Sequence, residues 1–149
     1  MDLSTERDWL QTLLTGRIPL AEAMQLKIVR LDGQGIALAA PLAPNVNDKG
    51  TAFGGALVSL MILAGWSLPR LALRRAGLAQ DLVIGRCEVR FRAPVNGDFG
   101  IECDWPEAAA VDAFVDAARS GGRARLDVHP RVVFNGELAA GLQARYAAI

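Results

Sequence analysis

Residues 54–75 read Gly-Gly-Ala-Leu-Val-Ser-Leu-Met-Ile-Leu-Ala-Gly-Trp-Ser-Leu-Pro-Arg-Leu-Ala-Leu-Arg-Arg, and the predicted architecture depends on them. No residue from Thr51 to Pro69 is charged, and the first half of the stretch is apolar on every side of a helix. Such a helix must be wrapped by other elements. The sequence therefore predicts a buried central helix from about Gly54 to Arg75, ended by Gly77. Pro69 is expected to kink this helix or to begin a second helical piece.

The same stretch is just long enough to suggest a membrane span. It begins with two glycines, however, and contains Ser59, Gly65 and Ser67. The segments on both sides of it look like soluble amphipathic strands. We therefore expect a core helix and no membrane span.

Segments with strand periodicity surround the central helix. Residues 25–31 and 36–42 are predicted to pair through the turn Asp32-Gly33-Gln34-Gly35. Beyond the helix, apolar and polar residues alternate over four further segments, at 83–91, 99–105, 124–134 and 138–146. On the first of these, the residues expected on the apolar face are Val83, Gly85, Cys87, Val89 and Phe91. Asn96-Gly97 and Asn135-Gly136 are typical of tight hairpins.

Two shorter helices complete the pattern. One is expected from Ser4 or Thr5 to about Gly16, and the other from Pro106 to Gly121. Strands with one apolar face need a cover, and only the central helix is apolar enough to supply it. The sequence thus predicts one α+β domain over residues 1–149, in the order α-β-β-α-β-β-α-β-β. In it, an antiparallel sheet curls around the central helix.

The composition of the chain argues against several classes of function. The chain has 149 residues, 52% of them hydrophobic, with 16 basic and 16 acidic residues and no net charge. A non-specific nucleic-acid binder normally carries a basic excess, so no nucleic-acid partner is expected. The chain has two separate cysteines and one histidine, so no structural zinc site is expected. The N-terminus lacks the pattern of a signal peptide, and we expect a cytoplasmic protein.

Three segments carry a family resemblance. They are residues 44–66, containing Asn-Asp-Lys-Gly-Thr-Ala-Phe-Gly-Gly at 47–55; residues 89–98, Val-Arg-Phe-Arg-Ala-Pro-Val-Asn-Gly-Asp; and residues 121–126 with the closing strand to Tyr146. Together they resemble the hotdog-fold thioesterases, and more narrowly the thioesterase family found as the C-terminal half of YiiD-type proteins. The resemblance covers most of the chain.

This resemblance implies a hotdog fold whose sheets join edge to edge in a homodimer, or in a homotetramer built from such pairs. It also implies hydrolysis of an acyl thioester, carried by CoA or an acyl-carrier protein, without a cofactor. By analogy with related hotdogs, the Gly55 N–H is the expected catalytic donor to the thioester oxygen. A helix N-terminus suits that role because its N–H groups and macrodipole stabilise negative charge. Gly54 lets substrate approach closely; the alternative is that both glycines only allow a tight loop.

The loop before the helix supplies the other candidates. Asn47 matches the motif's asparagine and could hold the attacking water, or it could be an Asx-turn residue. Asp48 is the nearest carboxylate and the candidate general base, against the alternative of a solvated loop charge. Thr51 and Phe53 are candidate substrate contacts. In hotdogs of the phenylacetate-pathway type an acid lies two turns into the helix, whereas this chain has Ile62 there.

Arginines cluster on predicted polar strand faces. Arg90 and Arg92 are candidate ligands for CoA phosphates, because guanidinium groups bind phosphate well. The alternative is an ion-pair lattice with neighbouring acidic residues on a solvated face.

Other activities have weaker support. Ser59 lacks a nucleophile elbow, and His129 is expected at the surface. Cys87 and Cys103 are expected to be core thiols. A hotdog dehydratase would need a histidine and an acid that the central helix lacks. A non-catalytic acyl-thioester binding module remains open, with Ile62 as its best support.

Overall fold

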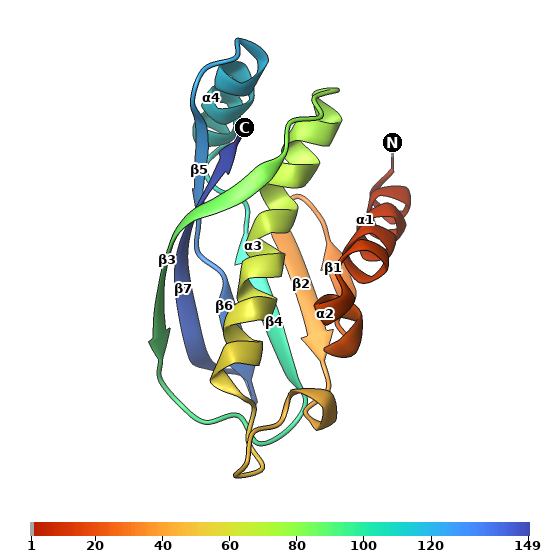
Figure 1. Ribbon diagram of the computed structural model, residues 1–149, viewed down its shortest axis with the longest axis vertical. Coiled ribbons are helices and arrows are strands. Elements are labelled where there is room, and N and C mark those ends of the chain that lie inside the picture. The colour runs from red at the N-terminus through yellow and green to blue at the C-terminus, as the bar shows by residue number, and fades with distance from the viewer. Residues whose placement is uncertain (1) are drawn as a thin grey trace.

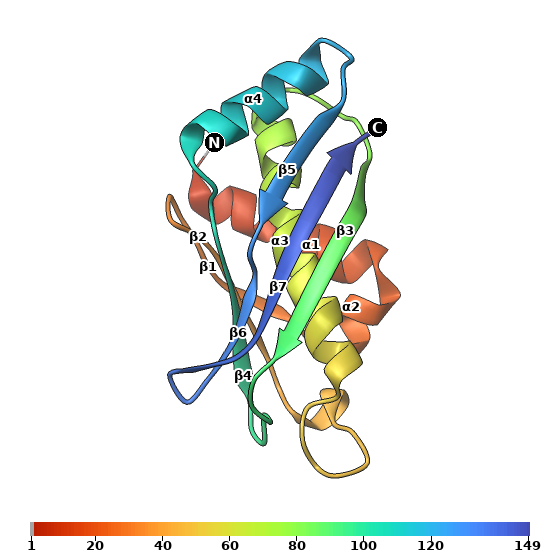
Figure 2. The ribbon, with the colours of Figure 1, turned by 90° about the vertical axis from the view of Figure 1, so that its left-hand side faces the viewer.

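A single long helix lies in the concave side of a curved antiparallel sheet (Figures 1 and 2). The computed structural model describes residues 2–149. The helices are α1 (Leu3–Arg17), α2 (Pro19–Ala23), α3 (Gly54–Arg75) and α4 (Ala108–Arg119), with a 3-10 turn at Ala43–Asn45. The strands are β1 (Lys27–Leu31), β2 (Gly35–Ala40), β3 (Leu82–Phe91), β4 (Phe99–Asp104), β5 (Ala124–Val128), β6 (Arg131–Phe134) and β7 (Glu137–Ala148). Their order across the sheet is β1-β2-β4-β6-β7-β3, with β5 also paired to β7.

The central helix forms where the sequence predicts it, because its apolar side chains leave water only by packing against the sheet. By length and hydropathy α3 could cross a membrane, but 72% of its most apolar window is buried inside the protein. It is therefore a core helix. No second helical piece begins at Pro69, which lies buried within one continuous helix. Gly77 follows the helix with φ +72°, a conformation that glycine adopts without strain.

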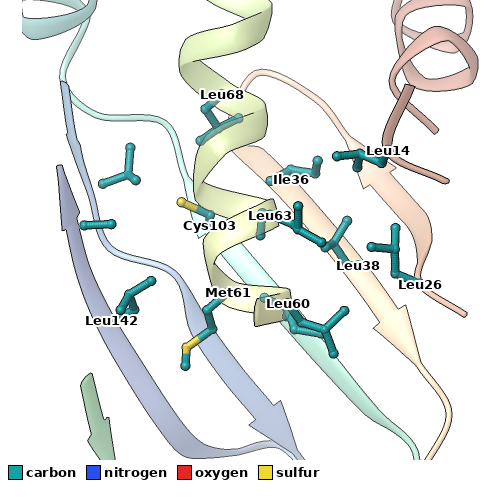
Figure 3. Close-up of a cluster of buried hydrophobic side chains, with 14 of the residues drawn as sticks. Leu14, Leu26, Ile36, Leu38, Leu60, Met61, Leu63, Leu68, Cys103 and Leu142 are labelled. Atoms are coloured by element: carbon teal, nitrogen blue, oxygen red, sulfur yellow. The ribbon is translucent and has the colours of Figure 1, made fainter. Parts of the chain in front are cut away.

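The core lies between α3 and the sheet (Figure 3). Leu60 and Met61 of α3 are fully buried there, together with Ile36 and Leu38 of β2. α1 adds Leu14 from the side of the sheet that carries β1. Burial of this kind contributes roughly 1.5–3 kcal/mol per large side chain.

Gly65, in the middle of α3, lets the helix lie close to the sheet. A Cβ at Gly65 would lie 2.9 Å from the Tyr146 hydroxyl oxygen and 3.0 Å from atoms of Val128 and Pro130. Tyr146 is fully buried, and its hydroxyl donates a hydrogen bond to the Ile62 carbonyl of α3. Burial raises the pKa of this tyrosine. The contact fixes α3 against β7.

Two turn predictions have different outcomes. Asn135 and Gly136 both have positive φ (52° and 75°) and join the paired strands β6 and β7, so that hairpin is confirmed. The predicted hairpin at Asn96-Gly97 is wrong. β3 pairs with β7, whereas β4 pairs with β2 and β6, so the two strands that this turn separates are not neighbours.

The predicted strand 124–134 is divided into β5 and β6 at His129-Pro130. Pro130 has no N–H to donate to a sheet ladder, which explains the interruption. Its carbonyl still accepts a hydrogen bond from the Leu142 N–H at 2.9 Å. Both pieces therefore follow the same neighbour, β7.

The edge strand β3 departs from strict alternation. Its register with β7 shifts between Ile84 and Arg86, and Ile84, rather than Val83, lies opposite the buried Tyr146. The predicted placement of Val83 on the core face is thus wrong. Cys87 is also exposed, which corrects its prediction as a core thiol, because β3 lies at the edge of the sheet. Cys103 is buried as expected, and burial raises its pKa to about 12.

Candidate active site

The N-terminus of α3 presents two backbone donors without acceptors. Phe53 is the N-cap residue and its side chain makes no capping hydrogen bond. Its carbonyl accepts from the Ala56 and Leu57 N–H groups at 2.9 and 3.1 Å. Within residues 2–149, the N–H groups of Gly54 and Gly55 have no hydrogen-bond acceptor. Such a helix end attracts negative charge.

Two exposed phenyl rings flank these donors. A Cβ at Gly55 would lie 2.5 Å from Cε2 of Phe53, and a Cβ at Gly54 would lie 3.4 Å from Cζ of Phe91. Phe53 is 57% exposed and Phe91 58% exposed, so neither ring is a core residue in the single chain. The arrangement places apolar surface beside polar N–H groups. It suits a ligand with a carbonyl next to an apolar chain.

Phe91 is the site residue that the sequence analysis did not single out. The available signal was its place in the Phe-Arg-Ala-Pro segment that carries the family resemblance. Its proximity to Gly54 could not be read from the chain, because residues 91 and 54 meet only when β3 passes alongside α3.

Asn47 organises the loop that leads into the helix. Its Oδ1 accepts from the Lys49 N–H at 2.8 Å and the Thr51 N–H at 3.1 Å, and its Nδ2 donates to the Thr51 hydroxyl at 2.7 Å. Gly50 at the tip of the loop has φ +83°. This bonding matches the Asx-turn alternative. Both Asn47 and Thr51 use polar atoms to hold the loop together.

The loop is tied to the rest of the fold through Asn45, a residue to which the sequence alone assigned no role. Asn45 is 2% exposed, and its Nδ2 donates to the carbonyls of Met24 and Pro41 at 3.0 and 2.8 Å. Its own carbonyl accepts from the Phe53 N–H at 2.7 Å. These bonds set the position at which α3 begins.

The carboxylate nearest in sequence lies in the same loop but faces solvent. The Asp48 side chain is 81% exposed and pairs with Lys49 at 3.2 Å. The helix itself offers no acid beside its first two turns, and Ile62 is partly buried against the core. Ser59 donates its hydroxyl to the Gly55 carbonyl at 2.8 Å, so it has a local backbone partner. Within residues 2–149, no group of three His, Cys, Asp or Glu side chains could hold a metal ion.

Arg90 and Arg92 lie away from the helix N-terminus. Phe91 reaches Gly54 on the α3 side of the sheet, and alternate residues of a strand point to opposite faces, so Arg90 points to the outer face. There Arg90 and Arg92 line a shallow groove that also includes His129. The ion-pair alternative holds for the neighbouring Arg131, which bonds Glu102 at 2.8 Å.

A larger hollow lies at the other end of α3. Its volume is about 810 Å³, and its lining includes Arg75, Trp105 and the apolar side of α4. The 22 residues of α3 span about 33 Å, so this hollow cannot share one thioester group with Gly55.

Comparison with known proteins identifies the fold and the relatives. A sequence model of the family described as "Putative thioesterase (yiiD_Cterm)" matches residues 7–149. A "putative thioesterase" from Shewanella oneidensis superposes with a TM-score of 0.89 at 24% identity, with 99% of both chains covered. A protein of unknown function from Chlorobaculum tepidum gives a TM-score of 0.91 at 26% identity, covering 96% of this chain and 93% of that one.

A more distant structure shows the same architecture. A thioesterase from Haemophilus influenzae superposes with a TM-score of 0.74 at 14% identity, covering 94% of this chain and 90% of that one. The hotdog fold predicted from the sequence is therefore confirmed.

Proposed function

This chain belongs to the YiiD C-terminal thioesterase family, and from that premise we propose that it hydrolyses an acyl thioester with the carbonyl held at the N-terminus of α3. The substrate would be an acyl-CoA or an acyl-carrier protein, and water would be the nucleophile. The observation that carries this proposal is the pair of unpartnered N–H groups at Gly54 and Gly55.

The proposed chemistry needs charge stabilisation more than a protein nucleophile. Attack on a thioester carbonyl develops negative charge on its oxygen, and fixed donors aimed at that oxygen lower the barrier. Removing one such donor costs about 2.7–4 kcal/mol in well-studied acyl-transfer enzymes. The Gly55 N–H is the proposed donor, and the helix macrodipole adds to its effect.

The phenyl rings give the acyl chain a place beside the reacting carbon. Phe53 and Phe91 would cover the first methylenes of the chain, which keeps bulk water away from the developing charge. Burial of an apolar chain against these rings contributes about 0.8 kcal/mol per methylene.

We assign activation of the attacking water to the loop that precedes α3. Asp48 is the proposed general base and Asn47 the residue that positions the water or the thioester. Asp48 is exposed in the single chain, so it can take part only if the substrate or a second subunit covers it. Asn47 retains one Nδ2 hydrogen beyond its bond to Thr51.

A second copy of the chain is the proposed cover. β3 is the outermost strand on its side of the sheet, with both Ile84 and Phe91 exposed. An unpaired edge with apolar side chains is a site where another strand adds. Antiparallel pairing of β3 with its counterpart would make a symmetric homodimer, alone or within a tetramer. That dimer would bring a second subunit beside Phe91 and the helix N-terminus.

The test is release of free thiol from a panel of acyl-CoAs, short, long and aryl, measured for the wild type, Asn47→Ala and Asp48→Asn. We expect turnover by the wild type and a loss of about 10²–10⁴-fold for Asp48→Asn, the range for removal of a general base. Lys49→Gln is the matched control, because it removes the charge that pairs with Asp48 and leaves the carboxylate in place.

Each result has a clear reading. Full turnover by Asp48→Asn would exclude Asp48 as the base and direct the search to the partner subunit. Binding of acyl-CoA with no turnover on any substrate, including acyl-carrier protein, would contradict hydrolysis and favour the binding module.

A further inference from the structure

The outer face of the sheet carries a groove that the thioester chemistry does not use. We call it the Gly141 groove. Its volume is about 390 Å³. Its lining includes Arg90, Arg92 and Arg131, the carboxylate of Glu88, and the apolar residues Gly141 and Leu138. The groove therefore combines guanidinium groups with an apolar floor.

A missing side chain creates the hollow. Gly141 on β7 lies directly between Arg90 on β3 and Arg131 on β6. Neighbouring strands are about 4.8 Å apart, so the two arginine backbones stand roughly 10 Å apart across the glycine. A Cβ at Gly141 would meet no atom within 4 Å. Packing therefore does not require glycine here, and the space between the arginines is open.

Within residues 2–149, the guanidinium groups of the two arginines on the β3 side of the groove are unpaired. Neither the Arg90 nor the Arg92 side chain makes a hydrogen bond or an ion pair with another residue of that range, although the Arg92 backbone N–H donates to the Ala139 carbonyl at 2.8 Å. On the same face, Arg131 bonds Glu102 at 2.8 Å and Arg145 bonds Asp127 at 2.8 and 3.1 Å.

Among the described residues, paired and unpaired arginine side chains therefore lie on the same face of the sheet. The chain has no net charge, so unpaired arginines are not a consequence of general basicity. Glu88, the carboxylate of the groove lining, pairs with neither Arg90 nor Arg92. Two guanidinium groups beside an empty hollow are suited to a doubly charged oxyanion.

We propose that the Gly141 groove binds a phosphate group of the thioester carrier, with Arg90 and Arg92 as its ligands and Gly141 providing the room. The inference rests on the proposed function for the identity of the carrier. The phosphate could be a nucleotide phosphate of CoA or that of a phosphopantetheine arm, which both present the same chemistry. The groove would then select phosphate-bearing thioesters over those without phosphate.

Calorimetric titration of the full chain tests the site without any turnover. The probes are CoA, adenosine 3′,5′-bisphosphate, 4′-phosphopantetheine and pantetheine. We expect CoA to bind at least tenfold more tightly than pantetheine, which lacks phosphate, since charge-assisted hydrogen bonds are stronger than those between neutral groups. Tight binding of the bisphosphate identifies the nucleotide as the source, and tight binding of phosphopantetheine identifies the arm. Equal affinity for CoA and pantetheine would overturn the proposal.

Arg86 provides a matched control for the variants. It is on the same strand and lies opposite Arg145 rather than Gly141, and it too makes no ion pair within residues 2–149. Arg90→Gln and Arg92→Gln should each weaken CoA binding about tenfold, and Arg86→Gln should leave it within twofold. Equal losses in all three variants would show only a diffuse charge effect and would overturn the assigned site.

Gly141→Leu fills the hollow and changes no charge. It should weaken CoA binding at least as much as Arg90→Gln, while the melting temperature stays near that of the wild type because the added atoms enter open space. Unchanged affinity in a folded Gly141→Leu protein would contradict the proposal.

Turnover separates this inference from the proposed function. With acyl-CoA as the substrate, Arg90→Gln should raise the KM about tenfold, whereas Arg86→Gln should leave the KM within twofold of the wild type. Arginine-dependent CoA binding without hydrolysis would support the groove and contradict the proposed function. Hydrolysis with no arginine dependence would support the function and overturn the groove.

Discussion

The two ends of α3 are built differently. At the C-terminal end a glycine with positive φ, capping backbone hydrogen bonds and basic side chains end the helix. Gly77 adopts a positive φ and its N–H donates to the Arg74 carbonyl at 3.0 Å, while the Leu78 N–H donates to the Leu73 carbonyl at 2.9 Å. Basic side chains fill the last turn, where they complement the helix dipole.

Those basic side chains are also held by partners. Arg75 makes two hydrogen bonds of 2.8 Å to Glu6 of α1, whose side chain is 4% exposed. The Arg75 guanidinium also lies 5.2 Å from the ring centre of Trp105. Arg70 and Arg74 lie 5.2 and 4.2 Å from the ring centre of Trp9. Together these contacts fasten the helix to α1 and to the end of β4.

The N-terminal end lacks these devices. No side chain caps it, its first two residues are glycines with unpartnered N–H groups, and its neighbouring rings are exposed. A capping side chain would typically contribute about 1 kcal/mol, so its absence has a measurable stability cost. Within residues 2–149, one end of α3 is thus closed by backbone and side-chain partners, and the other leaves two backbone donors unpartnered.

Among changes to the two ends of α3, the largest effect on activity is expected from deleting the Gly55 donor. Gly55→Pro removes an N–H that has no acceptor in the fold, and proline is tolerated in the first turn of a helix. We expect kcat/KM for an acyl thioester to fall about 10²–10³-fold with little loss of melting temperature. Gly55→Ala is the control, because it adds a Cβ beside Phe53 and keeps the N–H. Equal activity of the two variants would remove Gly55 from the mechanism.

The largest effect on stability, rather than on activity, is expected from loss of the ion pair at the other end of α3. Arg75→Met leaves the Glu6 carboxylate buried without its partner, which typically costs about 3–5 kcal/mol. Urea unfolding should show this loss, while turnover per folded molecule stays unchanged. In Arg145→Met, which breaks a similar pair with the half-exposed Asp127, the loss should be much smaller. A lower turnover per folded Arg75→Met molecule would mean that the two ends are not independent.

A smaller effect should follow from making the N-terminal end resemble the other. Phe53→Ser places an N-cap hydroxyl where the backbone already has the required extended conformation, with φ −64° and ψ 131°. Relative to Phe53→Ala, it should stabilise the protein by about 1 kcal/mol, because the hydroxyl accepts from a first-turn N–H. It should also be the less active of the two, since that N–H is then occupied. A stabilised variant with the activity of Phe53→Ala would separate capping from catalysis.

The smallest effect concerns the pH dependence of the stable end. The hydrogen bond from Arg75 holds the pKa of Glu6 below its ordinary value. A carboxyl of this kind contributes stability that is present above its unfolded pKa and is lost as the pH falls through its folded pKa. The destabilisation caused by Glu6→Gln should therefore be largest at pH 7 and shrink below about pH 4. Urea titrations of both proteins from pH 7 to pH 3 measure the difference, and a gap that stays constant would contradict it.

Local patterns were sufficient for most of the fold. The apolar run of α3, the alternation of the strands and the Asn135-Gly136 turn each act within a few residues, so each could be predicted. The errors arose where partners are distant. Asn96-Gly97 has the composition of a hairpin, but the strands on either side of it pair elsewhere. The register shift before Arg86 likewise depends on β7, more than 50 residues away.

The candidate site likewise contains residues that the sequence could predict and contacts that it could not. The residues from Asn47 to Gly55 are contiguous, so the sequence could name them together. Phe91 beside Gly54, Asn45 beneath the loop and Gly141 between two arginines are contacts across the fold. These contacts cannot be predicted from composition or from the spacing of residues along the chain.

The sequence by itself determined that one uncharged helix must be buried, that one-sided strands must cover it, and that two glycines begin it. Those outcomes follow from hydrophobicity and backbone freedom, which are properties of the residues themselves. The tertiary structure alone decided which N–H groups stay unpartnered, which rings stand beside them, and which arginines lack carboxylates. These depend on the register and curvature of the sheet, because a hydrogen bond or ion pair forms only when distant segments bring its atoms within about 3 Å.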